Sequence, residues 1–160
     1  MPAGAVTATS YIVGKDPDAY TPAKAADGDA DTAFQFSTKE SKPGSAYLYF
    51  DFDSPAEIDE LWIKNGIWKK EKGRDPYQRN CRVKDMTIEF CYAGGNDYRD
   101  PVAATLKDDK KRTDWTVVIL GRRTGVTRIR IRIDSVYKGS KFKNDVGISE
   151  IMFVKKTDGE

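Results

Sequence analysis

The sequence predicts an all-β fold, an eight-stranded jelly-roll β-sandwich, and three observations support this prediction. Apolar residues recur at every second position in several segments, which is the period of a half-buried strand. Glycine, proline and aspartate cluster between these segments and mark turns. The chain has 160 residues, which suits one domain and is short for two. We therefore expect a single domain over residues 1–160, with its ordered core at about residues 7–154.

The alternating segments give the expected strands in chain order. They are residues 46–53, 57–64, 84–92, 113–120, 128–133 and 148–154. The turn residues Asp53-Ser54-Pro55 predict that the first two strands form an antiparallel hairpin. The long loops 26–45 and 66–83 would then lie side by side at one end of the sandwich. Pro22–Ala26 is the one helix-like segment, with Thr21 as its expected N-cap.

The composition excludes several classes of function. The chain has no histidine, which rules out a Ser-His-Asp triad, a Cys-His pair and an HExxH zinc site. Its net charge of +2 argues against nucleic acid as a partner. No apolar run reaches the ~20 residues that a membrane span needs. Cys81 and Cys91 lie ten residues apart on one extended segment, too far for a disulfide, and we expect two free thiols.

An acidic turn, Asp27-Gly28-Asp29-Ala30-Asp31-Thr32, is the first candidate site. Its carboxylates at alternate positions are similar to the start of an EF-hand loop. Thr32 and Thr38 stand where an EF-hand needs glycine and glutamate, so this class is excluded. The turn could still hold Ca²⁺ if a distant carboxylate completed the shell. The alternative is a solvated turn in which the aspartates cap the backbone.

An arginine ladder is the second candidate. Arg128, Arg130 and Arg132 share one face of their predicted strand, at ~6.6 Å spacing. They could bind an anionic ligand. The favoured alternative is a solvated face on which acids such as Asp51 and Glu89 pair with the arginines.

The loop 65–82 is the third candidate, because it combines aromatic rings with planar hydrogen-bonding groups. An aromatic face can stack on the C–H surface of a sugar, while Arg, Asn and Gln bind its hydroxyls. In the alternative interpretation Trp68 and Tyr77 pack under the loop as structural caps. The acidic residues show no pattern typical of the paired carboxylates of a glycosidase, and we expect no enzymatic activity.

These motifs, taken in order, resemble those of discoidin-like domains, also called coagulation-factor type C or galactose-binding-like domains. Residues 20–34 resemble the family signature Ser-Pro-x-x-Ala-x-Asp-Gly-Asp-x-x-Thr-x-Trp, with Phe34 in place of the tryptophan. Residues 63–66, 80–84, 135–142 and 148–153 are similar to the NADase-type glycan-binding branch. The likeness covers about residues 7–154.

The resemblance implies a non-catalytic jelly roll that binds glycans, or other surface ligands, through loops at one end. It implies an exported parent protein, at an extracellular, periplasmic or cell-surface location, whose other domains are further partners. It also implies a structural Ca²⁺ ion at Asp27, Asp29, Thr32 and Glu150. The candidate glycan-binding residues are Trp68, Tyr77, Arg79, Asn80, Arg82 and Tyr137. The rival function is a structural or adhesive module that binds a protein through the arginine ladder and the adjacent face of Tyr47 and Tyr49.

Overall fold

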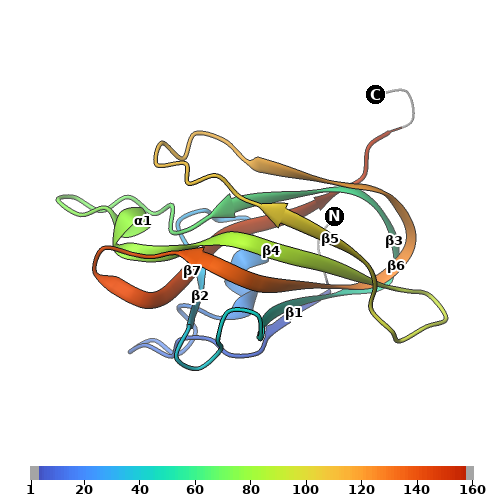
Figure 1. Cartoon of the computed structure of the whole chain (residues 1–160), viewed down its shortest axis with the longest axis horizontal. Coiled ribbons are helices and arrows are strands. Elements are labelled where there is room, and N and C mark those ends of the chain that lie inside the picture. Colours follow the sequence, from blue (N-terminus) through green and yellow to red (C-terminus); the bar gives the residue numbers. More distant parts are fainter. Residues whose placement is uncertain (1–3, 158–160) are drawn as a thin grey trace.

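The chain folds into a jelly-roll β-sandwich in which two long strands pass from one layer to the other (Figure 1). The computed structural model describes residues 4–157. The long strands β3 (Ala46–Asn65) and β6 (Thr116–Tyr137) pair antiparallel over most of their length. The other elements are β1 (Ala5–Ala8), the 3-10 helix η1 (Pro22–Ala26), β2 (Phe34–Ser37), α1 (Pro76–Arg79), β4 (Asn80–Tyr92), β5 (Arg99–Thr105) and β7 (Phe142–Val154).

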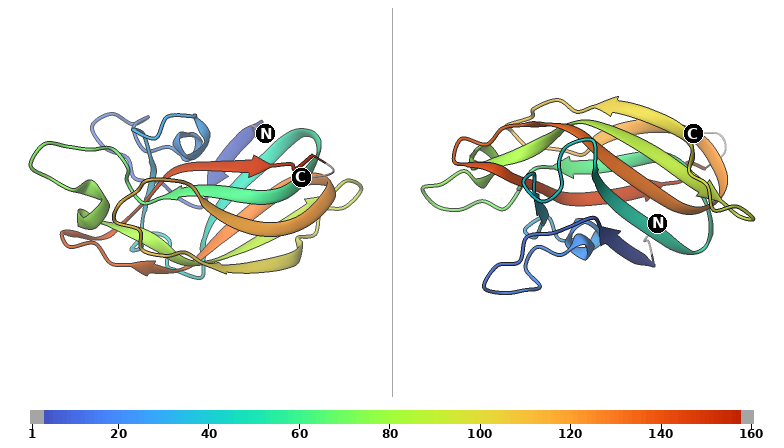
Figure 2. Two further views of the ribbon diagram at one scale, coloured as in Figure 1. Left: turned by 90° about the horizontal axis from the view of Figure 1, so that it is seen from above. Right: turned by 60° about the horizontal axis from the view of Figure 1, so that its bottom comes forward.

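Each layer of the sandwich takes one half of β3 and one half of β6. The first layer contains β1, the first half of β3, the second half of β6, β4 and β5. The second layer contains the first part of β6, the second half of β3, β7 and β2. Figure 2 shows β3 and β6 curving from one layer into the other at one end of the molecule. The predicted all-β jelly roll is confirmed; the described residues form seven strands, or nine if the halves of β3 and β6 count separately.

The core lies between the layers and follows the alternation of the sequence. Side chains at every second position of β3, β4 and β6 are buried, because one face of each strand turns toward the opposite layer. These buried side chains include Leu48, Phe50, Met86, Ile88, Phe90, Ile129, Ile131 and Ile133. β7 contributes Phe153, whose ring packs edge-on against Phe50 at 4.9 Å between centroids. Burial of these apolar surfaces supplies the main driving force for folding.

The predicted hairpin between residues 46–53 and 57–64 is wrong. Both segments belong to the single strand β3, so Ala46 and Asn65 lie at opposite ends of one strand. The pairing register of β3 with β6 shifts between Asp51 and Ala56, which marks a β-bulge where a turn was expected. A bulge bends and twists a strand without reversing it. Segment 26–33 still approaches loop 66–80, because β2 pairs with β7 at that end of the second layer.

Several smaller predictions can be compared with the structure. η1 forms over Pro22–Ala26, but the Thr21 side chain makes no capping hydrogen bond. Both cysteines are buried free thiols. The arginine ladder is paired, as the solvated-face interpretation predicted: Arg128 binds Asp51 at 2.5 Å and Arg130 binds Glu89 at 3.0 Å. None of the helices within residues 4–157 is long and apolar enough to cross a membrane.

Candidate functional site

A groove of about 630 Å³ opens at the loop end of the sandwich. One wall comes from the segment between Ile12 and Gln35, which contains η1 and the acidic turn. The other wall comes from the loop after β3, from α1 and from the start of β7. The groove therefore lies between the first two long loops of the chain. These loops are adjacent as predicted, although the hairpin from which their adjacency was predicted does not form.

Two aromatic rings line the groove, those of Tyr20 and Phe142. Phe142 is 41% exposed, although it is the first residue of β7. The Arg79 guanidinium carbon lies 5.6 Å from the centre of the Phe142 ring. The Lys141 ammonium nitrogen lies at the same distance, 5.6 Å. The site thus offers a partly exposed apolar ring with two cationic hydrogen-bond donors lying over it.

Charged side chains of both signs surround these rings. The cations are Lys24, Lys69, Arg74, Arg79 and Lys141, and the acids are Asp16, Asp31, Glu71 and Asp145. None of them forms an ion pair within residues 4–157, whereas seven arginines elsewhere do: Arg82, Arg112, Arg122, Arg123, Arg128, Arg130 and Arg132. The groove therefore keeps both donors and acceptors available, which suits ligands rich in hydroxyl groups.

Two of the predicted glycan-binding residues, Arg79 and Asn80, line this groove. Arg79 is partly exposed at the C-terminal end of α1. Asn80 is almost fully buried, and its amide nitrogen donates to the Pro76 carbonyl at 3.0 Å. Both positions are set by α1, a single turn that begins where the Asp75 carboxylate accepts a hydrogen bond from the Tyr77 backbone N–H.

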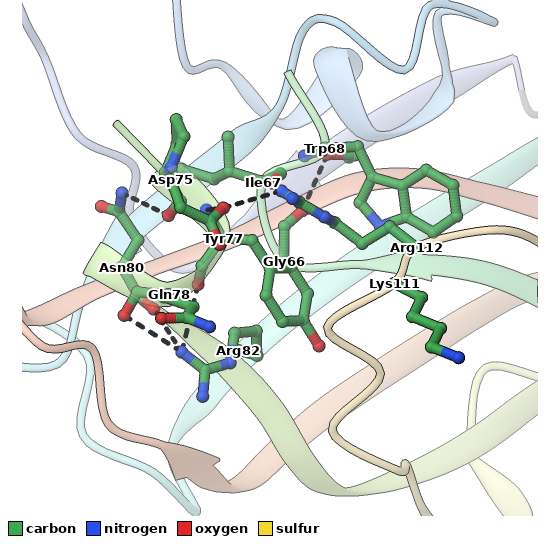
Figure 3. Close-up of polar contacts among 12 residues, drawn as sticks. Gly66, Ile67, Trp68, Asp75, Tyr77, Gln78, Asn80, Arg82, Lys111 and Arg112 are labelled. Carbon is green, nitrogen blue, oxygen red and sulfur yellow. Dashed lines mark hydrogen bonds and ion pairs between the residues drawn. The ribbon is translucent and has the colours of Figure 1, made fainter. Parts of the chain in front are cut away.

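Tyr77 and Arg82 instead lie inside the protein, 1% and 6% exposed. Arg82 makes two hydrogen bonds to the Asp108 carboxylate, from Nε at 3.1 Å and from Nη2 at 2.9 Å. Its third nitrogen donates to the carbonyls of Tyr77 at 3.1 Å and Asn80 at 3.0 Å (Figure 3). The Tyr77 hydroxyl donates to the same carboxylate at 2.8 Å. These two residues hold the wall of the groove and do not line it.

The hydrogen bonds of this network shift the pKa values of Asp108 and Tyr77 in opposite directions. Burial disfavours the charged form of Asp108, but the hydrogen bonds from Arg82 and Tyr77 outweigh it and lower the pKa of Asp108. Burial and the hydrogen bond to Asp108 raise the pKa of Tyr77, which therefore stays protonated and donates. Asp108 is thus a fixed anion that orients two donors from a different part of the chain.

Arg112 is a second residue of this region that the sequence did not reveal. Its guanidinium donates to the Ile67 carbonyl at 3.2 Å, pairs with Asp75 at 3.0 Å and lies 5.0 Å from the Tyr77 ring centre. It thereby ties the 106–115 loop to the groove wall. Neither Asp108 nor Arg112 stands in a recognisable motif, and only the folded chain brings them to α1.

The last two predicted glycan-binding residues lie apart from the groove lining. The Tyr137 hydroxyl donates to the Leu106 carbonyl at 2.7 Å. The Trp68 indole donates to the Asn65 carbonyl at 2.8 Å, and in Figure 3 it lies apart from Asn80 and Arg82. The Lys64 ammonium is 5.2 Å from the Trp68 ring centre and 4.6 Å from that of Trp115. Trp68 therefore belongs to an aromatic cluster on the outer face of the second layer.

The acidic turn packs against β7. The Gly28 backbone N–H donates to Glu150 Oε1 at 2.8 Å, and the Thr32 hydroxyl donates to the Asp27 carboxylate. Burial, together with the adjacent Asp27 carboxylate, raises the pKa of Glu150 to about 7. Asp29 accepts a hydrogen bond from the Asp31 backbone N–H at 2.9 Å. Within residues 4–157, no three acidic or cysteine side chains are gathered closely enough to hold a metal ion by themselves.

Comparison with solved structures identifies proteins that share this fold. An F5/8 type C domain from Bacteroides fragilis superposes with a TM-score of 0.67 at 16% identity, covering 93% of this chain and 89% of that one. A pectin-binding carbohydrate-binding module gives 0.66 at 18% identity, covering 98% and 93%. A Clostridium perfringens module in complex with GalNAc-β-1,3-galactose gives 0.66 at 12% identity, covering 94% of each chain. At these identities the likeness establishes the shared fold.

Sequence comparison establishes the family. Among curated proteins no relative is found. A family model for the NAD glycohydrolase translocation F5/8 type C domain matches residues 3–154, nearly the whole chain. The resemblance to coagulation-factor type C domains and to their NADase-type branch is thereby confirmed. The chain belongs to the NAD glycohydrolase translocation F5/8 type C domain family.

Proposed function

We propose that this domain binds glycans, without catalysis, through the groove at its loop end. The observation that carries the proposal is the groove itself, where the Tyr20 and Phe142 rings stand among donors and acceptors that no ion pair within residues 4–157 occupies. A sugar presents apolar C–H faces and many hydroxyls, so it needs this combination. Domains of the same fold include carbohydrate-binding modules, among them the pectin-binding module and the module in complex with GalNAc-β-1,3-galactose.

One further observation supports a binding role over hydrolysis. The carboxyl group with the raised pKa, Glu150, packs against Asp27 and Gly28 and is not part of the groove lining. A glycosidase needs such an acid beside the scissile bond. The family name refers to translocation of an NAD glycohydrolase, and we propose that the domain attaches an exported parent protein to glycans of a cell surface.

Glycan binding is expected to depend on Phe142 and Arg79. A glycan array that includes pectin-derived and GalNAc-galactose-terminated oligosaccharides identifies a ligand, and titration calorimetry measures its affinity. Phe142→Ala removes the exposed ring and should weaken binding at least about tenfold, equivalent to ~1.4 kcal/mol. Arg79→Ala removes a donor beside that ring and should weaken binding severalfold.

Arg99 on β5 provides a matched control, because it is also an arginine without an ion pair within residues 4–157 but does not line the groove. Arg99→Ala should leave the affinity unchanged. Trp68→Ala should also leave it unchanged if the variant folds. Equal losses for Arg79→Ala and Arg99→Ala would count against the groove, and a silent array would count against glycan binding as a whole.

We also propose that the acidic turn holds a structural Ca²⁺ ion. Asp27 and Glu150 supply two adjacent carboxylates, and Asp29 and Thr32 supply further oxygen atoms from the same turn. These are the hard oxygen ligands that Ca²⁺ prefers. The ion would hold the turn that forms one wall of the groove against β7, and it would stabilise only the folded chain.

The calcium proposal predicts a change in melting temperature. Calcium should raise the melting temperature of the wild type above its value in EDTA, because the ion binds the folded state alone. Glu150→Gln keeps the shape of the side chain but removes one anionic ligand, and it should abolish this difference. Scanning calorimetry in both buffers checks the prediction; identical melting of the wild type with and without calcium would contradict it.

A further inference from the structure

The first part of β6 is an open edge of the second layer. Residues 116–119 pair with β3 on one side, for example through Val118 opposite Leu61 and Ile119 opposite Glu60, and the register shifts after Ile119. On its other side β6 pairs with β4 only from Val126 onward. No backbone partner covers the outer edge of residues 116–120 within the described chain. In Figure 1 this light-orange part of β6 lies along the upper edge of the sandwich, beside β3.

Residues 116–120 lack the residue types that usually protect an edge strand; a β-bulge follows Ile119, and Arg123 donates to the Leu120 carbonyl. The segment Thr116-Val117-Val118-Ile119-Leu120 contains no charge, proline or glycine and is β-branched at four of five positions. Val117 is 43% exposed and Ile119 is 65% exposed. Natural edge strands are normally blocked by lysine, proline or a covering segment, because unpaired backbone groups recruit another strand. An exposed apolar edge of this kind indicates a partner that supplies a strand.

The sequence around Val118 is complementary to itself in an antiparallel arrangement. With Val118 at a two-fold axis, Val117 of one copy stands opposite Ile119 of the other, and both side chains are on the outer face. Trp115 precedes β6 and packs against Trp62 of its own chain, and Gly121, whose φ is 76°, has no atom within 4 Å of the position that a Cβ would take. The pairing therefore joins apolar side chains at its centre, and Gly121 adds no side chain at its end.

The charges at the two ends also match. Asp114 is exposed and forms no ion pair within residues 4–157; its carboxylate accepts only the neighbouring Trp115 N–H, at 2.8 Å. Four residues after the axis stands Arg122, which binds Asp59 at 2.7 Å and has a side chain that is 38% exposed. Asp114 precedes the first residue of β6, and Arg122 follows the paired residues 116–119, so an antiparallel pair brings the Asp114 end of each copy toward the Arg122 end of the other. Opposite charges at the two ends favour this orientation of the strands, whereas like charges would oppose it.

We propose that two copies of this chain associate through the open edge of β6, antiparallel and centred on Val118. The contact is isologous, as expected of a symmetric dimer, and it extends the second layer across both protomers. Each groove lies at the end where β6 begins, so the antiparallel contact directs the two grooves toward opposite ends of the dimer. Such a dimer bridges two surfaces instead of binding twice to one.

Analytical ultracentrifugation of the whole chain over a wide concentration range tests the association. The wild type should approach twice the 18.0 kDa mass of one chain as the concentration rises. Ile119→Lys places a charge in the centre of the contact and should weaken dimerisation at least about tenfold. At concentrations where both proteins are monomeric, the replacement should barely alter the melting temperature, because Ile119 is 65% exposed.

Val13 is the matched control, since it is an apolar residue of the same exposure, 66%, outside β6. Val13→Lys should dimerise like the wild type. A wild type that stays monomeric at every concentration overturns the proposal, because the edge of β6 then does not pair with a second copy of the chain. A dimer that survives Ile119→Lys, or that is lost equally in Val13→Lys, overturns it as well.

Cross-linking tests the register. The double variant Val117→Cys/Ile119→Cys places two thiols at facing positions, and mild oxidation should give a covalent dimer on a non-reducing gel. The native Cys81 and Cys91 are buried and should not interfere. Val13→Cys should remain uncross-linked. Absence of the covalent dimer in the double variant, when ultracentrifugation shows that this variant dimerises, overturns the register centred on Val118.

Discussion

Replacing Arg82 with alanine is expected to lower the free energy of unfolding by about 3–5 kcal/mol. The substitution leaves Asp108 as a partly buried carboxylate without its guanidinium partner, and it removes the donor to the carbonyls of Tyr77 and Asn80. A buried charge that loses its partner is much more costly than a surface pair that is broken. Urea unfolding of the wild type and Arg82→Ala, followed by tryptophan fluorescence, measures the difference.

Arg128 offers the control for this prediction. Its guanidinium also binds an aspartate, Asp51 at 2.5 Å, but both side chains are well exposed. Arg128→Ala should therefore cost less than about 1 kcal/mol. Should the two variants lose similar amounts of stability, the buried network around Asp108 would not be the support of the groove wall that the geometry indicates.

In the absence of calcium, the folded state is expected to lose stability as the pH rises from about 4.5 to about 7. A glutamate side chain ordinarily has a pKa of 4.5, and in the folded protein burial and Asp27 raise the pKa of Glu150 to about 7. The folded state therefore binds this proton more tightly than the unfolded state does, so raising the pH favours unfolding. The shift limits the effect to about 3 kcal/mol, complete above the folded pKa. Urea unfolding in EDTA at a series of pH values measures it.

Glu150→Gln supplies the control, because glutamine stays neutral at every pH in this range. The variant should show little of the decline between pH 4.5 and pH 7, and near pH 8 it should be more stable than the wild type in EDTA. Calcium should reverse this order, since the ion needs the ionised carboxylate. A wild type whose stability in EDTA is flat across this range would show that Glu150 ionises in the folded protein as it does in water.

The all-β fold could be predicted from the sequence because alternation is a local signal. Ile129, Ile131 and Ile133 between arginines give the buried face of β6 without any knowledge of the partner strand. The connection between residues 46–53 and 57–64 could not be predicted in this way. Asp53-Ser54-Pro55 suits a turn, but β3 continues through it with a shift in register. Whether such a segment reverses or bends depends on the facing strand, here β6, which lies about seventy residues later in the chain.

The candidate site could likewise be predicted only in part from the sequence. The loop after β3 was identified by its composition, and Arg79 and Asn80 of that loop line the groove. The sequence could not show that Tyr77 is buried, because its burial depends on Asp108 and Arg112, which come from a distant loop. Phe142 was also missed: an aromatic residue at the start of a strand is usually part of the core, and its exposure of 41% is a property of the assembled loop end.

Because β3 and β6 each belong to both layers, the two layers of this sandwich cannot slide past each other or separate independently. A displacement of one layer would strain β3 and β6, which also form part of the other layer. These two strands are paired from Ala46–Ile133 to Ile63–Thr116. The scaffold beneath the groove is thus one continuous pair of strands folded over itself, and not two separate sheets stacked face to face. A ligand that pulls on the loop end transmits its load through the whole body of the domain.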